Sequence, residues 1–209
     1  MGGSATEARL VPRPLASSTM ERIDLGPCRA IRHEGDADRV AVVLPGLFYP
    51  TRAPALWFAR EAAMSRGWSA LEVLGEPGEH EDPLTWERWC AERAIEAALP
   101  ARVLVIGKSL ASLLAADISE RDLPTVWLTP LLNERSVIDG LASARRPALL
   151  VGGSADETWR PDAVPRERDI DLLELPGADH SLEIPGDPVT SLTGLGQMTD
   201  AVMRFADAV

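Results

Sequence analysis

The sequence predicts an α/β domain with a doubly wound, mostly parallel sheet and helices on both of its faces. Short apolar runs rich in β-branched residues alternate along the chain with longer stretches of helical periodicity, the pattern of a parallel sheet covered by helices. Several of these runs lack polar alternation, as expected of strands that are buried on both faces. The length of 209 residues and the hydrophobic content of 45% suit a single domain with a substantial core.

Turn and cap residues place the individual elements. The run at residues 39–44 stops at Pro45-Gly46, and the first helix is framed by Pro54 near its start and Gly67 after its end. The expected strands are residues 39–44, 68–74, 102–106, 125–128, 147–151 and 170–175, after a short edge strand or hairpin at 23–32. The expected helices are 54–66, 84–99, 110–118, 134–144 and 192–208, and the charged residues of 84–99 (Glu87, Arg88, Glu92, Arg93 and Glu96) are interpreted as a solvated face.

Composition and charge limit the cellular compartment and the kinds of binding partner that we expect. Residues 1–20 are expected to be a disordered lead-in or tag, since they lack the charged-then-apolar order of a secretory signal, and 21–209 to form the single domain. Cys28 and Cys90 have no partner spacing, which favours ordinary semi-buried thiols in a reducing cytoplasm over disulfides or zinc. No apolar run approaches the roughly 18 residues of a membrane span. The net charge of -11 argues against nucleic-acid and membrane partners.

Ser109 carries the one local pattern with a clear chemical meaning. It follows an apolar strand and stands between small residues, Gly107 and Ala111, before a helical stretch. A serine at such a sharp strand-to-helix turn is typical of a nucleophile elbow, which lifts the hydroxyl clear of the sheet. The alternative is a phosphate-binding P-loop, but that motif needs a glycine where this chain has Arg102, and a pliable loop where it has a strand.

Two nearby features receive a structural interpretation. Lys108 is the single lysine of the chain and is expected to be an exposed elbow residue, because adjacent side chains on a sharp turn diverge. His80 lies among Glu79, Glu81 and Asp82, but without metal-ligand spacing, so a solvated loop is expected there. No metal and no cofactor are predicted.

The order of three residues then resembles that of the α/β-hydrolase superfamily, in its small, cap-less bacterial serine hydrolase form. Ser109, Asp156 and His180 follow one another at successive strand ends, in the family's order of nucleophile, acid and base. The resemblance covers nearly all of the chain after about Arg39, although the usual first strands are not clear. It implies a triad of Ser109, Asp156 and His180. Asp179 and Asp162 are the alternative candidates for the acid.

The resemblance also implies the rest of the site. The backbone N–H groups of Leu47 and Leu110 are the expected oxyanion hole, and Phe48 and Trp159 are the candidates for the substrate pocket. The interval 131–146 holds one short helical piece, so a minimal lid and an open cleft are expected.

The expected activity is hydrolysis of a small-molecule or carrier-borne ester, thioester or amide through an acyl-enzyme. Two alternatives remain open. One is a non-hydrolytic binding or scaffold protein with the same fold, and the other is a lyase or acyltransferase that uses the same triad.

Overall fold

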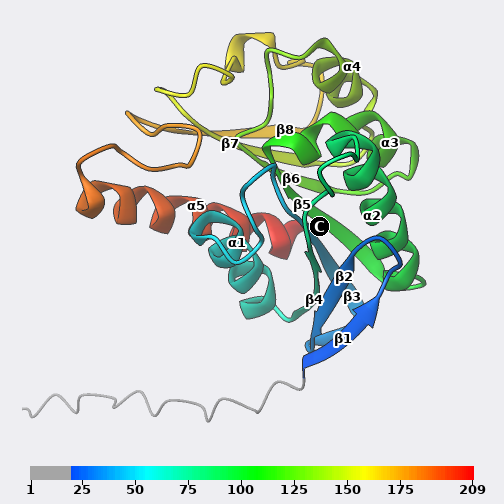
Figure 1. Ribbon diagram of the computed structural model, residues 1–209. Helices are drawn as coiled ribbons and strands as arrows, with labels where there is room; N and C mark the ends of the chain where they lie inside the picture. Colours follow the sequence, from blue (N-terminus) through cyan, green and yellow to red (C-terminus); the bar gives the residue numbers. More distant parts are fainter. Residues whose placement is uncertain (1–19) are drawn as a thin grey trace, which may run out of the picture.

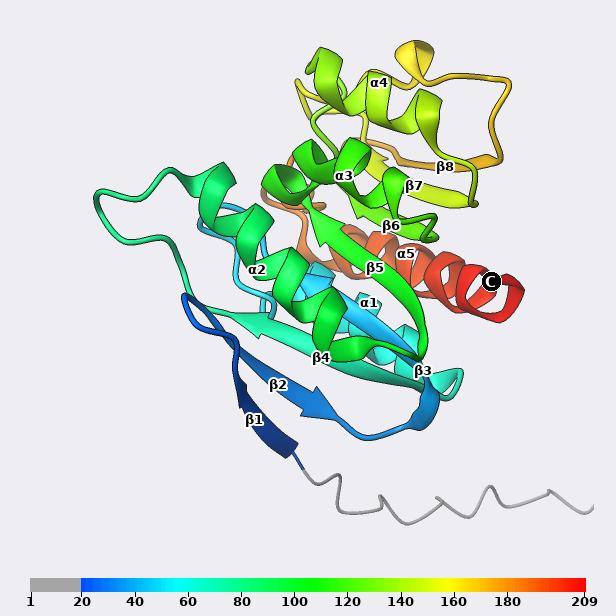
Figure 2. The same cartoon turned by 90° about the vertical axis from the view of Figure 1, so that its right-hand side faces the viewer.

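A computed structural model describes residues 20–209, which form one eight-stranded sheet with helices on both faces (Figures 1 and 2). The strand order is β1-β2-β4-β3-β5-β6-β7-β8. Strand β2 pairs antiparallel with β1 and β4, and the remaining pairs are parallel. The expected doubly wound, mostly parallel α/β architecture is therefore confirmed. The expected lead-in, apart from Met20, lies outside the described residues and stays a prediction.

The strands follow the expected runs closely. They are β1 (Met20–Asp24), β2 (Arg29–His33), β3 (Asp36–Leu44), β4 (Trp68–Leu74), β5 (Arg102–Lys108), β6 (Thr125–Leu128), β7 (Ala148–Gly153) and β8 (Ile170–Leu175). The expected edge hairpin at 23–32 is present as the β1–β2 pair. Strand β3 begins three residues before its expected start, and β5 and β7 each continue two residues past their expected ends. The extension of β5 carries Lys108 into the sheet.

The helices are α1 (Pro54–Ser65), α2 (Pro83–Ala98), α3 (Ala115–Glu120), α4 (Arg135–Ser143) and α5 (Pro188–Ala208). A 3₁₀ turn, η1 (Ser109–Leu114), precedes α3, and a second one, η2 (Pro161–Ala163), follows β7. Asp82 caps α2 by accepting a hydrogen bond from the Thr85 N–H, and Pro83 occupies the first turn, where its missing N–H costs nothing. The single helix expected at 110–118 is thus two segments of different pitch.

Each central strand sends alternate side chains into two separate cores. In β3, Val40, Val42 and Leu44 face the core shared with α2, α3 and α4, whereas Ala41 and Val43 face the core shared with α1 and α5. The two helix layers lie on opposite sides of the sheet in Figures 1 and 2. Burial on both faces is the physical reason why these strands read as continuous apolar runs.

One charged residue of α2 does not follow the expected pattern. Glu87 is only 1% exposed, so the interpretation of all five charges as a solvated face is wrong at this position. The residue stands three and four positions before Cys90 and Ala91, which are buried, and this spacing puts it on the inward stripe of the helix.

Within residues 20–209 no cap domain is inserted between β6 and β7, since only α4 and its short connections separate these strands. In residues 20–209, none of the helices has the length and apolarity required to cross a membrane.

Candidate active site

Ser109 stands at the carboxyl end of β5 in a strained backbone conformation. Its φ is +51°, a region that residues other than glycine adopt rarely and at a cost of about 1–3 kcal/mol. The turn also depends on Gly107, because a Cβ there would lie 2.6 Å from the Trp127 ring and 2.9 Å from the Ala111 Cβ. The strand, the strained serine and the turn behind it form the geometry of a nucleophile elbow.

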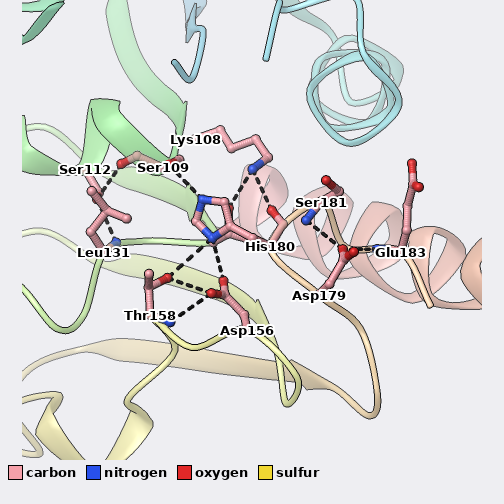
Figure 3. A network of polar contacts seen from close by, with 11 residues as sticks. Lys108, Ser109, Ser112, Leu131, Asp156, Thr158, Asp179, His180, Ser181 and Glu183 are labelled. Atoms are coloured by element: carbon pink, nitrogen blue, oxygen red, sulfur yellow. Dashed lines mark hydrogen bonds and ion pairs between the residues drawn. The ribbon is translucent and has the colours of Figure 1, made fainter. Parts of the chain in front are cut away.

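Three side chains from separate loops form one hydrogen-bonded chain (Figure 3). The Ser109 Oγ lies 2.8 Å from His180 Nε2, and the other ring nitrogen, Nδ1, lies 2.8 Å from Asp156 Oδ2. The serine follows β5, the aspartate follows β7 and the histidine follows β8. The parallel sheet brings these residues together because all three strands end at the same edge.

Thr158 completes the surroundings of Asp156. Its backbone N–H and its hydroxyl both donate to Asp156 Oδ1, at 2.9 and 2.8 Å. Burial alone would raise the pKa of Asp156, but the hydrogen bonds from His180 and Thr158 bring that pKa below its ordinary value. The carboxylate is therefore held in its ionised form beside the imidazole. Thr158 was not among the residues expected at the site. Its signal in the sequence is Asp156 itself, because an aspartate side chain often accepts a hydrogen bond from the backbone N–H two residues later.

The other acid and base candidates have different partners. Asp179 Oδ1 accepts hydrogen bonds from the backbone N–H groups of Ser181 and Glu183, so it shapes the loop that carries His180. Asp162 lies in η2. His33 is buried against Glu72 at 2.8 Å, and His80 is exposed in the loop before α2.

The expected oxyanion donors belong to the loop after β3 and to the turn that follows Ser109. The loop after β3 turns back at Gly46 and Tyr49, whose backbones exchange both hydrogen bonds of the turn and leave the Leu47 N–H outside it. A Cβ on Gly46 would lie 3.2 Å from the Lys108 carbonyl oxygen, so glycine allows this close approach. Leu110 is the second residue of η1, and its N–H has no acceptor within that turn.

Lys108 is the largest departure from expectation at the site. The structure contradicts an exposed elbow lysine, because the side chain is 1% exposed. Its Nζ donates to Thr129 Oγ1 at 2.8 Å and to the His180 carbonyl at 2.7 Å, and it lies 4.4 Å from the Tyr49 ring centroid. Burial lowers the pKa of this ammonium to about 8, against the opposing attraction of Asp156 and Asp179. The lysine thus ties the elbow strand to the histidine loop.

The two pocket candidates occupy different environments. Phe48 is 82% exposed and lines a cavity together with Leu47 and Leu110. Trp159 is 5% exposed, belongs to the core cluster and donates from Nε1 to Glu174 at 2.8 Å. The structure therefore places Phe48 at a cavity and Trp159 in the core.

The described residues contain no group of three or more His, Cys, Asp or Glu side chains that could hold a metal ion. Cys28 and Cys90 are buried free thiols in contact with each other. Sequence spacing gave no indication of this contact, because it joins the β1–β2 turn to α2.

The fold and the site together define the class: the chain has the α/β-hydrolase fold, in a small form without a cap. No protein-family model and no curated protein matches the chain by sequence, so this assignment comes from solved structures. The chain is similar to an α/β serine hydrolase without a lid, XC6422 from Xanthomonas campestris, at 19% identity and a TM-score of 0.67, over 90% of this chain and 94% of that one.

Two further structures have similar scores. Est1E from Butyrivibrio proteoclasticus has 15% identity and a TM-score of 0.67, covering 90% of this chain and 97% of that one. Dienelactone hydrolase from Anabaena variabilis has 15% identity and a TM-score of 0.65, with the same coverage of both chains. At such identities the similarity establishes the fold, and the chemistry has to be argued from the site.

Proposed function

We propose that this protein is a serine hydrolase that cleaves an ester, thioester or amide through an acyl-enzyme. The observation that carries the proposal is the chain of two 2.8 Å contacts that joins Ser109, His180 and Asp156. These distances lie within the range needed for proton transfer between a nucleophile and its base. The presence of esterases and hydrolases among the structural neighbours supports the proposal at the level of the fold.

In the first half of the reaction, Ser109 Oγ attacks the substrate carbonyl while its proton moves to His180 Nε2. Asp156 accepts the Nδ1–H bond, keeps the imidazole in the required tautomer and stabilises the imidazolium that forms. The oxyanion is bound by the Leu47 and Leu110 N–H groups. The leaving group then takes the proton from Nε2, which leaves the acyl group on Ser109.

In the second half, a water molecule replaces the leaving group. His180 Nε2 removes a proton from the water, the resulting hydroxide attacks the acyl carbonyl, and the Ser109 oxygen leaves and regains its proton. The ionised state of Asp156 matters in both halves, because it stabilises the positive charge on the imidazole each time.

A fluorophosphonate probe tests the nucleophile. We expect covalent labelling of the native protein and none after Ser109→Ala. The matched control is Ser181→Ala, which removes a hydroxyl from the neighbouring loop and is expected to leave labelling intact. A folded native protein that is not labelled would overturn the proposal.

The base is tested by ester cleavage. His180→Ala is expected to lower kcat/KM by about 10³-fold or more with little change in melting temperature, whereas His80→Ala on the exposed loop is expected to have no effect. The opposite pattern would contradict the assignment of the base. Product analysis with and without an added alcohol or amine acceptor distinguishes hydrolysis from acyl transfer.

A further inference from the structure

A cavity of about 480 Å³ opens beside the elbow, on the side of Leu47 and Leu110. Its walls come from the loop after β3, from the loop between β4 and α2, which extends away from the sheet in Figure 2, and from the first turns of α2. Four glutamates line it (Glu76, Glu79, Glu81 and Glu87), and no Arg, Lys or His is among its lining residues. The cavity therefore has an acidic lining without a counter-charge.

Glu87 lies at the buried end of this acidic lining. Its side chain is 1% exposed, and Oε1 has no hydrogen-bond partner among the described residues. A buried polar atom without a partner costs about 1–3 kcal/mol, and such atoms are rare in folded proteins. Burial raises the pKa of Glu87 to about 8, and the nearby Cys28 thiol adds to this. The carboxyl group thus lacks the partner that its ionised form requires.

Glu72, the other buried glutamate in residues 20–209, differs from Glu87 in its hydrogen-bond partners. Glu72 is equally buried, but it accepts hydrogen bonds from Arg60 at 2.8 Å and Thr51 at 2.9 Å and pairs with His33 at 2.8 Å. Burial alone would raise the pKa of Glu72, yet these partners bring it below its ordinary value. The fold supplies a complete set of donors to one buried carboxyl and none to the other.

Trp86 reinforces this observation. Its indole Nε1 is also buried without a partner, and its side chain lines the same cavity. Two adjacent residues that line this cavity therefore each have a buried polar atom without a partner, a combination that points to a ligand site. Their needs differ, because Glu87 Oε1 lacks a donor and the indole N–H lacks an acceptor.

The position of the cavity decides which part of a substrate would enter it. A leaving group has to face His180 Nε2, because that nitrogen returns the proton to it. The cavity is lined by Leu47 and Leu110, the oxyanion residues, and His180 is not among its lining residues. The part of the substrate on this side is consequently the acyl group, which stays attached to Ser109 after the leaving group departs.

We infer that this cavity is an acyl pocket for a cationic group, a protonated amine at the end of the acyl chain, which pairs with Glu87 and is attracted by the glutamates at the rim. The inference rests on the proposed hydrolase function and names its substrate class. A bound ammonium favours the ionised carboxylate and supplies the hydrogen-bond donor that Oε1 lacks. Leu47, Phe48 and Leu110 provide apolar surface for the methylene chain.

Three nitrophenyl esters of similar acyl length test this inference: ω-aminohexanoate, heptanoate and the monoamide of adipate. We expect kcat/KM for the amine ester to exceed that for heptanoate by about 10-fold or more, and to exceed that for the neutral amide as well. Glu87→Gln is expected to lower the ratio of amine to heptanoate ester by about 10–100-fold, the usual effect of losing a hydrogen bond between charged groups. Glu120→Gln, the same change at an exposed position on α3, is the matched control and should keep the ratio.

Each outcome bears on the inference separately from the hydrolase function. If heptanoate is cleaved and Ser109 is labelled, but the amine ester shows no advantage or Glu87→Gln keeps the ratio, the inference is wrong and the proposed function stands. If the amide ester is as good as the amine ester, charge recognition is refuted. If no ester is cleaved and no probe reacts, the hydrolase function itself fails. Should Glu87→Gln not fold, the exposed double variant Glu76→Gln/Glu79→Gln decides, with an expected drop in the ratio of about 3-fold.

Discussion

Replacing Lys108 by Met separates two effects of this buried lysine. Methionine has a similar length and no charge, and it removes the hydrogen bonds to Thr129 and to the His180 carbonyl. Lowering the lysine pKa from its ordinary 10.5 to about 8 means that the charged form costs about 3 kcal/mol in the folded state. The two acceptors left unpaired cost about 1–3 kcal/mol each. The cost of the charge and the cost of the two unpaired acceptors oppose each other, so the free energy of unfolding at pH 7 should change by no more than about 3 kcal/mol.

The pH dependence of stability gives the sharper result. Below pH 8 Lys108 binds its proton in both the folded and the unfolded state. Between pH 8 and 10.5 the unfolded state keeps a proton that the folded state has released, so the free energy of unfolding rises with pH. From pH 7 to pH 9.5 Lys108 contributes about 2 kcal/mol to this rise. The contribution is absent from Lys108→Met, whereas the opposing loss from Glu87, whose pKa burial raises to about 8, is common to both proteins.

Urea unfolding of both proteins at the two pH values measures this difference directly. Ester hydrolysis at pH 7 measures the second effect, because His180 loses the contact that holds its backbone, and kcat/KM should fall by about 10–100-fold. If the stability difference between native and variant protein is the same at both pH values, the lysine does not titrate near pH 8. Full activity in a folded variant would show that Lys108 does not position the histidine.

Three further substitutions test other parts of the structure. Thr158→Val removes the hydroxyl donor from Asp156 and keeps the backbone N–H donor, so the pKa of Asp156 should rise, the acid limb of the pH–rate profile should move to higher pH, and kcat should fall by up to about 10-fold. Glu72→Gln removes the buried carboxylate that pairs with Arg60, which keeps Glu61 as a second partner, and should cost about 1–3 kcal/mol in urea unfolding. Gly107→Ala places a methyl group 2.6 Å from a buried indole ring and should cost at least about 1–3 kcal/mol, measured as a lower melting temperature.

Controls for these variants lie on the surface. Asp139→Asn breaks the exposed pair with Arg135 and should change the free energy of unfolding by less than about 1 kcal/mol. If the pH profile of Thr158→Val is unshifted, the hydrogen bond from the Thr158 hydroxyl does not lower the pKa of Asp156. Native-like stability of Glu72→Gln or Gly107→Ala would contradict the packing described around those residues.

Much of the fold could be predicted because its signals are local. Strands β4 and β6 have the predicted bounds, since a strand buried on both faces is a mostly apolar run between polar turns. Strand β8 also has the predicted bounds, although it is partly exposed. The helix after Ser109 was predicted less well. Its first turn is 3₁₀, because the chain leaves the elbow with φ at +51°, and a local helical periodicity carries no information about such a constraint.

The residues of the hydrogen-bonded chain could also be named in advance, because in a parallel sheet the carboxyl ends of the strands meet at one edge. Strand order puts these loops at one edge, and the resemblance to the α/β-hydrolase superfamily implies Ser109, Asp156 and His180 as the neighbours. The burial of Lys108 was harder to predict from the sequence. It stands two residues after Ile106 in a strand of period two, on a face that points into the core, and an assumed strand end at residue 106 concealed this.

The amino-acid sequence by itself determined the alternation of strands and helices, the elbow at Ser109 and the identity of its two partners, because periodicity, turn chemistry and strand order are properties of the chain. Only the tertiary structure decided which polar groups are paired. Arg60 and His33 reach Glu72 from distant elements, whereas no donor within residues 20–209 reaches Glu87 Oε1. That difference depends on contacts between segments far apart in the chain. It is the reason why Glu87 of α2 is a candidate contact for the substrate.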